Sequence, residues 1–267
     1  MKRTLGAVIV TAALTAPALA ADLGARTYTK APALAPASNW SGLYVGGNLG
    51  YGWGDGNTDV TLLPALAEFD LNNASLGARS SSVIGGAQLG YNWQIGSVVT
   101  GLEADIQGSG IKGSARANPT LVANGIPDPS SVLSSEQKLS WFGTVRGRLG
   151  VTVTPELLLY GTGGLAYGRV DASANWFESI ESFQFQAPAS VSKTKVGWTA
   201  GAGAEWMFAH NWSAKLEYLY VDLGSESAIG NLTSMNPQAL VEPGFSVGHT
   251  WCFRENIARA GVNYHFN

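Results

Sequence analysis

The last residues of the chain alternate between two kinds of side chain. Every second position from Ala258 to Phe266 is apolar, and the interleaved positions from Ile257 to His265 are mostly polar. A period of two is the signature of a β-strand whose two faces lie in different surroundings. The pattern therefore predicts a strand here and leaves open which of its faces meets water.

Runs of this kind recur from Trp40 onward and predict eight strands. We place them at residues 41–53, 81–93, 98–109, 138–152, 157–171, 195–208, 212–224 and 253–266. Three connections are short, at residues 94–97, 153–156 and 209–211, and four are long, at residues 54–80, 110–137, 172–194 and 225–252. Long and short connections alternate strictly, which is typical of bacterial outer-membrane barrels. We therefore expect an all-β protein, an eight-stranded antiparallel up-and-down transmembrane β-barrel within residues 40–267.

Aromatic residues favour this interpretation over a soluble, lipocalin-like barrel, which would turn its apolar residues inward. Large rings occur on the apolar set of positions near the strand ends, where the two membrane interfaces would lie. The predicted interface aromatics are Tyr51, Trp53, Tyr91, Trp93, Trp198, Trp206, Tyr218, Tyr220, Tyr264 and Phe266. The predicted strands are also long enough for the 9 to 11 residues or so that a tilted strand needs to cross the hydrocarbon.

The opposite set of strand positions carries charges of both signs and forms the candidate lumen. Its charged members are Glu103, Asp105, Arg146, Arg148, Glu205, Lys215, Glu217 and Arg259. Glu205 and Lys215 are equally distant from the turn at His210, so a simple hairpin would set them opposite each other. Glu103 and Asp105 should likewise face Arg146 and Arg148. Because eight strands enclose little more than their own inward side chains, we expect these charges to pair, fill the lumen and permit at most a small conductance.

The first 39 residues predict export. A basic start at Met1-Lys2-Arg3, an apolar run from Leu5 to Ala16 and the small-x-small triplet at residues 18–20 predict a signal peptide at 1–20, removed near Ala20/Ala21 after transport through the Sec pathway. The apolar run is shorter than the 18 or so residues of a spanning helix. Residues 21–39 are rich in Ala and Pro and predict an extended periplasmic tether.

Composition narrows the class of protein. The 267 residues include 34 Gly and 27 aromatic residues, and only 13% are charged, which fits neither a helical transporter nor a disordered chain. The single Cys252 excludes a disulfide within the chain. The net charge of −3, without a basic run, gives no indication of a nucleic-acid partner.

Seven sequence blocks together resemble a known family. They are "WSGLYVGGNLGYGWG" at 40–54, "SVIGGAQLGYNWQ" at 82–94, "SWFGTVRGRLG" at 140–150, "LLYGTGGLAYG" at 158–168, "GWTAGAGAEW" at 197–206, "WSAKLEYLYVDLG" at 212–224 and the terminal "ARAGVNYHF". In this order they are similar to the small outer-membrane β-barrel proteins of alphaproteobacteria, the rhizobial and brucella-type family related to opacity proteins. The resemblance implies a structural envelope protein of the outer membrane with surface-exposed loops. It also implies contact with outer-membrane lipid and lipopolysaccharide, and recognition of the C-terminal strand by the barrel assembly machinery.

Catalytic and cofactor motifs are weak. The glycine-rich runs lack the strand-to-helix context of a phosphate loop, and His210, His249 and His265 have no metal-ligand spacing. We therefore expect no enzyme activity, no cofactor and no metal. The alternatives left open are a hydrolase site on the external loops, a small-solute diffusion pore, and binding of haem or of a host or partner protein. The apolar residues Leu62, Leu63, Leu66 and Phe69 in the first long connection would serve such binding.

Overall fold

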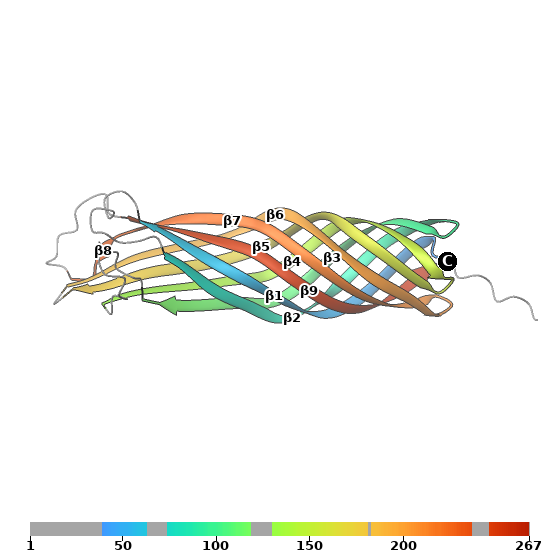
Figure 1. Cartoon of the computed structure of the whole chain (residues 1–267), viewed down its shortest axis with the longest axis horizontal. Helices are drawn as coiled ribbons and strands as arrows, with labels where there is room; N and C mark the ends of the chain where they lie inside the picture. The colour runs from blue at the N-terminus through green and yellow to red at the C-terminus, as the bar shows by residue number, and fades with distance from the viewer. Residues whose placement is uncertain (1–38, 63–73, 119–129, 181–182, 237–245, 267) are drawn as a thin grey trace, which may run out of the picture. The chain divides into compact units, whose positions relative to one another are not determined.

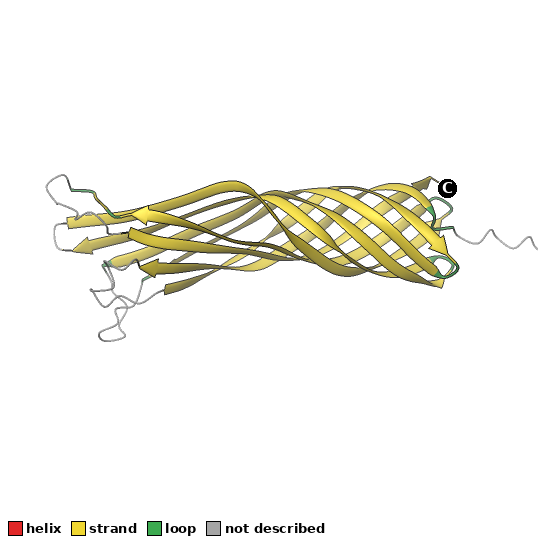
Figure 2. Ribbon diagram, turned by 90° about the horizontal axis from the view of Figure 1, so that it is seen from above, coloured by secondary structure: helices red, strands yellow, loops and turns green. Residues whose placement is uncertain are grey.

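The computed structural model describes residues 39–62, 74–118, 130–180, 183–236 and 246–266, and these residues are almost entirely β-strand (Figure 2). The strands are β1 (Gly42–Leu62), β2 (Ala74–Ile95), β3 (Val98–Ala117), β4 (Ser131–Thr154), β5 (Leu157–Ile180), β6 (Phe183–Ala209), β7 (Trp212–Asn231), β8 (Thr233–Ser234) and β9 (Ser246–Phe266). No helix within the described ranges is long and apolar enough to span a membrane. The predicted signal peptide at 1–20 and nearly all of the tether at 21–39 lie outside the described residues.

The eight long strands form one closed antiparallel sheet (Figure 1). Each pairs with its neighbour in the chain, β7 pairs with β9, and β9 pairs with β1 to close the ring. The two-residue β8 adds only a short pairing with β6. Apart from this element, the structure has the up-and-down barrel topology that the alternating connections predict.

One end of the barrel is closed by tight turns. Two residues join β2 to β3, β4 to β5 and β6 to β7, namely Gly96–Ser97, Pro155–Glu156 and His210–Asn211. Gly96 has a φ of 62°, a left-handed conformation that glycine adopts without steric cost. The described end of β9 lies at this same end (Figure 1).

The strands extend well beyond the bounds that the sequence predicts at the other end. β1 continues to Leu62 and β2 begins at Ala74, so most of the predicted connection at 54–80 is strand. The predicted connections 110–137, 172–194 and 225–252 are shortened in the same way. Residues 63–73, 119–129, 181–182 and 237–245, with Leu63, Leu66 and Phe69 among them, lie outside the described residues.

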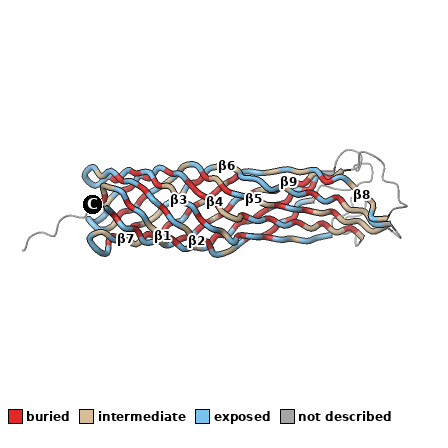
Figure 3. Tube along the Cα trace, turned by 180° about the vertical axis from the view of Figure 1, so that it is seen from behind, coloured by how far each residue is buried: buried red, intermediate tan, exposed pale blue. Residues whose placement is uncertain are grey.

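The reason for this difference is that the two faces exchange character partway along each strand. In the lower half of β9, nearest the turns, Ala260 and Val262 point outward while Arg259 and Asn263 are buried. Farther up the same strand, Trp251, Phe253 and Ile257 are buried and Arg254 is exposed. The alternation of buried and exposed positions continues into the upper parts of the strands (Figure 3), with a shift of one residue at the irregularities near Leu139 in β4 and Asp222 in β7. A sequence pattern that requires one face to stay apolar therefore predicts the end of the strand at the point where the apolar residues change to the other face.

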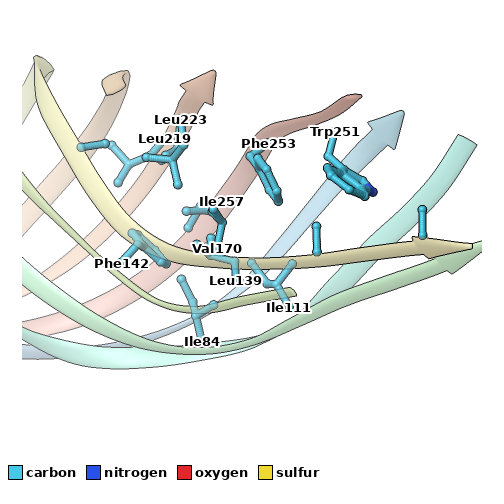
Figure 4. Packing of buried hydrophobic residues seen from close by; sticks show 14 of the residues in the cluster. Ile84, Ile111, Leu139, Phe142, Val170, Leu219, Leu223, Trp251, Phe253 and Ile257 are labelled. Atoms are coloured by element: carbon cyan, nitrogen blue, oxygen red, sulfur yellow. The ribbon is translucent and has the colours of Figure 1, made fainter. Parts of the chain in front are cut away.

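The interior is built in layers along the barrel. Trp40, Val99, Leu158, Tyr160 and Met207 form an apolar cluster at the turn end, where the Trp40 indole Nε1 donates to the carbonyl oxygen of Pro155 at 3.0 Å. The charged residues follow. Above them lies the largest apolar cluster, in which side chains from opposite walls meet (Figure 4). A further cluster around Leu133, Trp176 and Val247 fills the interior near the outer end.

One seam of the upper wall is held by side chains instead of a backbone ladder. The β6–β7 pairing runs from Ala209↔Trp212 to Trp198↔Asp222 and ends there, next to Gly224 with a φ of 75°. Between this point and the short β6–β8 pairing, Lys193 and Lys195 of β6 both contact the Glu226 carboxylate of β7, and Lys195 also donates to the carbonyl oxygen of Ser225; the Lys195 Nζ–Glu226 Oε2 distance is 2.9 Å.

The seam should loosen when Glu226 loses its charge. Hydrogen bonds from Lys193 and Lys195 hold the pKa of Glu226 below its ordinary value of 4.5. Because the pKa of Glu226 is lower in the folded state, its charge stabilises the fold at pH values above the ordinary pKa. This stabilisation is lost as the pH falls through the folded-state pKa. We expect Glu226→Gln to lower the protection of the amides in residues 190–197 and 225–230 against hydrogen exchange at neutral pH. In the unsubstituted protein, acid should lower the protection of the same amides relative to their intrinsic exchange rate at that pH. Exchange in residues 199–207 should not change, and Glu136→Gln on the exposed face of β4 is the matched control. Equal exchange in all three proteins would contradict this role of the ion pairs.

Candidate functional site in the barrel lumen

The sheet register brings the predicted lumen charges together. Glu103 on β3 is the direct partner of Arg146 on β4, Glu205 on β6 is the partner of Lys215 on β7, and Glu217 on β7 is the partner of Arg259 on β9. Asp105 and Arg148 lie two residues along their strands from the first pair. All eight side chains point into the interior because they share the inward parity of their strands.

The centre of the site is a cluster in which each charge meets more than one opposite charge. Arg146 contacts Glu103, and it also lies 3.1 Å from Asp105 and 3.2 Å from Glu217. Arg259 Nη2 lies 2.9 Å from Asp105 and 2.6 Å from Glu217. Lys215 Nζ completes the cluster at 2.9 Å from Glu103. These contacts tie β3, β4, β7 and β9 together across the lumen.

Arg148 forms a second part of the site with Glu205, at 2.7 Å. Its guanidinium carbon lies 4.1 Å from the centre of the Tyr160 ring and 5.6 Å from that of Tyr44, within the range of cation–π attraction. The Tyr44 hydroxyl donates to Glu103 at 2.6 Å, and the Tyr160 hydroxyl donates to Glu217 at 2.9 Å. The two tyrosines therefore connect Arg148 to the central cluster.

A chain of side-chain amides satisfies the remaining carboxylate oxygen of Glu205. Asn48 Nδ2 donates to Gln88 at 2.8 Å, Gln88 Nε2 donates to Asn263 at 2.6 Å, and Asn263 Nδ2 donates to Glu205 Oε1 at 2.6 Å. The Ser213 hydroxyl donates to the same oxygen at 2.6 Å. This polar chain links β1 and β2 to β6, so the hydrogen-bonded layer reaches most of the wall.

The charged layer is shielded from water at both ends. None of its eight charged residues is more than 4% exposed, and the four acidic and four basic groups balance. The apolar cluster around Trp40 lies on the turn side and the apolar cluster around Phe142 on the other. Ions of both signs can be held in so narrow a space because each is paired and hydrogen-bonded. The eight charged residues and the apolar clusters on either side of them together fill this part of the lumen, and we call this filled part the plug.

Sequence reasoning missed Tyr44 and Tyr160. Tyr44 shares the inward parity of Asn48, so its position in the first strand was a usable signal. Tyr160 lies in the predicted strand at 157–171, in which both sets of alternate positions carry apolar or small residues, so the sequence did not show which set points inward. In the structure, Leu158, Tyr160 and Ala166 point inward.

The aromatic residues predicted at the membrane interfaces all lie on the outer surface, in two groups. Tyr91, Trp93, Trp206, Tyr264 and Phe266 are near the turn end, where Tyr91 and Trp93 have ring centres 4.7 Å apart. Tyr51, Trp53, Trp198, Tyr218 and Tyr220 lie farther up the wall, where Trp198 and Tyr220 are 5.4 Å apart. Trp141 and Tyr167, which were not predicted, extend the second group at 6.1 Å from each other. Exposed aliphatic side chains such as Leu102 and Leu149 occupy the surface between the groups.

The histidines are far from one another in the fold. His210 lies in a turn, His265 is buried in the lower lumen, and His249 is buried near the outer end of β9. Within the described ranges, no three residues among His, Cys, Asp and Glu are grouped so that they could hold a metal ion.

Comparison with known proteins agrees with this architecture. The family model described as "Outer membrane protein beta-barrel domain" matches residues 6–266. The chain is 37% identical over 234 residues to the 31 kDa outer-membrane immunogenic protein of Brucella melitensis biotype 1, covering 85% of this chain and 87% of the relative. It is 34% identical over 192 residues to a 22 kDa outer membrane protein of Rhizobium leguminosarum bv. viciae, covering 72% and 68%.

A solved structure with similarity to the barrel is the outer membrane protein OprG from Pseudomonas aeruginosa, with a TM-score of 0.43, 13% identity, and coverage of 86% of this chain and 99% of that one. The family assignment rests on the sequence matches, which span nearly all of the chain. The chain belongs to the outer-membrane β-barrel family and is an outer-membrane protein with alphaproteobacterial relatives.

Proposed function

We propose that this protein acts as a structural element of the outer membrane whose lumen is closed to solutes. The observation that carries the proposal is the neutral cluster of eight charges, held between two apolar layers in the lumen. A diffusion pore needs a continuous aqueous path, and an eight-stranded barrel has little interior volume beyond its own side chains. The barrel would therefore support the envelope by its stability and its contact with lipid.

The two groups of outward aromatic residues support a placement in the bilayer. β1 passes from Leu43 to Trp53 between them, which matches the 9 to 11 residues or so that a tilted strand needs to cross the hydrocarbon. The tight turns would then face the periplasm, and the strand segments beyond Trp53 would stand above the outer leaflet. Asn57, Asp59 and Thr61 are exposed on that upper part of β1, as water-facing side chains would be.

A catalytic role has little support from the side chains. The carboxylates and cations of the lumen are engaged with one another, and apolar layers separate them from either opening. A substrate would have to displace one of these layers to reach them. Our proposal therefore assigns the charged layer to stability and closure, without chemistry on a substrate.

The first test is conductance. The full-length mature protein in planar bilayers should give no stable large conductance, because the plug has no continuous aqueous path. A steady open-channel current from the monomer would replace the proposal with a diffusion pore.

The second test is stability. Replacing Arg146 and Arg148 together by serine leaves four buried carboxylates with two basic partners, Lys215 and Arg259, and takes from Glu205 its arginine. The free energy of unfolding should therefore fall by about 3 kcal/mol or more. The matched control is Arg169→Ser with Arg254→Ser, which removes two exposed arginines and should cost less than about 1 kcal/mol. Thermal unfolding in detergent measures both. The lumen double substitution should also raise the leak current, and equal stability in the two variants would contradict the plug.

The third test is orientation. In a Cys252→Ser background, cysteine at Asn57 should react with a membrane-impermeant maleimide on intact cells, because this part of β1 should lie above the outer leaflet. Cysteine at Ser97, in a turn at the opposite end, should react only after the outer membrane is permeabilised. The reverse labelling pattern would mean that the tight turns face outward.

A further inference from the structure

His249 lies inside the upper part of the barrel and is fully buried. Its cross-strand partners are Val60 on β1 and Ala228 on β7, and its ring stacks on that of Trp251, with 6.0 Å between the ring centres. The largest apolar cluster, which includes Trp251, lies below it, and the cluster that contains Val60 and Val247 lies above it. Neither ring nitrogen of His249 has a well-aligned hydrogen-bond partner among the described residues. The site therefore suits the neutral imidazole and not the imidazolium ion.

The same histidine lies on the inner side of the seam between β6 and β7. Its cross-strand partner Ala228 belongs to the part of β7 that has no backbone pairing with β6, because that pairing ends at Trp198 and Asp222. At this height the two strands are close: a Cβ atom at Gly230 of β7 would lie 2.6 Å from the carbonyl oxygen of Ala187 on β6. The upper part of β6 is therefore held against β7 by packing and side chains, and His249 is part of that packing.

Charged side chains of the upper wall do not neutralise a proton on His249. On the strands around it, they include Asp59 on β1, Glu136 and Lys138 on β4, Asp171 and Glu178 on β5, Lys193 and Lys195 on β6, Glu226 on β7, and Arg254 and Glu255 on β9. Glu226 is paired with Trp251 in the register, and its carboxylate is already in contact with two lysines. Glu255 is six positions farther down β9, where Ser80 donates to it at 3.0 Å. Among the described residues, no charged group acts on the pKa of His249.

Acid should therefore weaken the closed arrangement of the upper barrel. Burial lowers the pKa of His249 from its ordinary value of 6.5, and the nearby backbone of Ala187 opposes this only in part. An arrangement that releases the ring into water restores the ordinary pKa and so binds more protons. The closed arrangement is fully favoured above the ordinary pKa. As the pH falls below that value, the ratio of open to closed molecules rises by up to about tenfold per pH unit, until the pKa of the buried ring is reached.

We propose that His249 is an acid-sensitive latch for the outer end of this barrel. The neutral ring packs on Trp251 and keeps the upper part of β6 against β7 and β9. The protonated ring leaves its apolar site for water, and the seam opens. The lower wall keeps its β6–β7 backbone ladder, which ends at Trp198, so opening is confined to the strand segments above it. The latch lies above the charged layer and works in the same way whether or not the lumen conducts.

The test is amide hydrogen exchange in the full-length mature protein in phosphatidylcholine nanodiscs, with each rate divided by the intrinsic rate at that pH. Between about pH 7.5 and about pH 5.5, the protection of residues 187–197 and 225–231 should fall about tenfold, since the lower pH is about one unit below the ordinary pKa of histidine. The protection of residues 199–207, in the paired part of β6, should not change.

Three kinds of variant identify the group that titrates. His249→Phe keeps an aromatic ring against Trp251 but takes up no proton, so its protection should be equal at the two pH values; His249→Leu is measured beside it, so that the result does not depend on how phenylalanine packs. His210→Phe, the matched control, removes a histidine from a tight turn at the opposite end and should keep the full fall. Glu226→Gln should lower protection at both pH values and still show the fall between them, because the pKa of Glu226 lies below 4.5.

Unchanged protection of the unsubstituted protein at the lower pH would overturn the latch. A fall that persists in both His249 variants, or that disappears in Glu226→Gln, would also overturn it, because a different group would then be responsible. An equal fall in residues 199–207 would replace the latch with general unfolding of the barrel in acid.

Discussion

The paired charges of the lumen are the interaction on which the rest of this barrel depends. Closing eight strands leaves a narrow interior, and in the lower half of the barrel the charged residues of the strands point into it while the apolar residues of the same strands point outward. Four carboxylates and four cations fill the space with their charges balanced, and Tyr44 and Tyr160 bridge them by hydrogen bonds. Removing one partner would leave an ion buried in a space that cannot hydrate it.

The upper half of the barrel obeys the opposite requirement. There the outer face carries groups such as Arg254 and Lys138, and the interior closes around Trp251 and Phe253. The interior changes from polar to apolar along the same strands whose outer surface changes from apolar to polar. A barrel that continues out of a membrane into water must reverse its faces in this way, because the solvent changes while the pleat does not. The apolar core above the charged layer follows from this reversal and also helps to isolate the charges.

The outer wall is not uniform around the barrel. On the side formed by β3, β4 and β5, backbone pairings run to the upper ends of the strands, with local irregularities at Gly108 and Leu139. The side between β6 and β7 loses its ladder above Trp198, and the cations there are used to join the two strands through Glu226.

Much of this organisation could be predicted from the sequence, because alternate residues of a barrel strand point to the lumen and to the outer surface. Local alternation indicated the eight long strands and the three tight turns. The antiparallel hairpin geometry was enough to place Glu205 opposite Lys215. Strand parity set Glu103 and Asp105 on the same inward face as Arg146 and Arg148, but only the register pairs Glu103 with Arg146 and places Asp105 opposite Thr144. The upper strand segments escaped detection because the apolar face changes sides near Trp53 and Ile257, and a change of face looks like the end of a strand. Only the closed structure decided which charges meet across the lumen, such as Arg146 with Glu217 and Arg259 with Asp105. Both pairs join strands that are not neighbours in the sheet, and their contact depends on the barrel's curvature and stagger, which no local pattern contains.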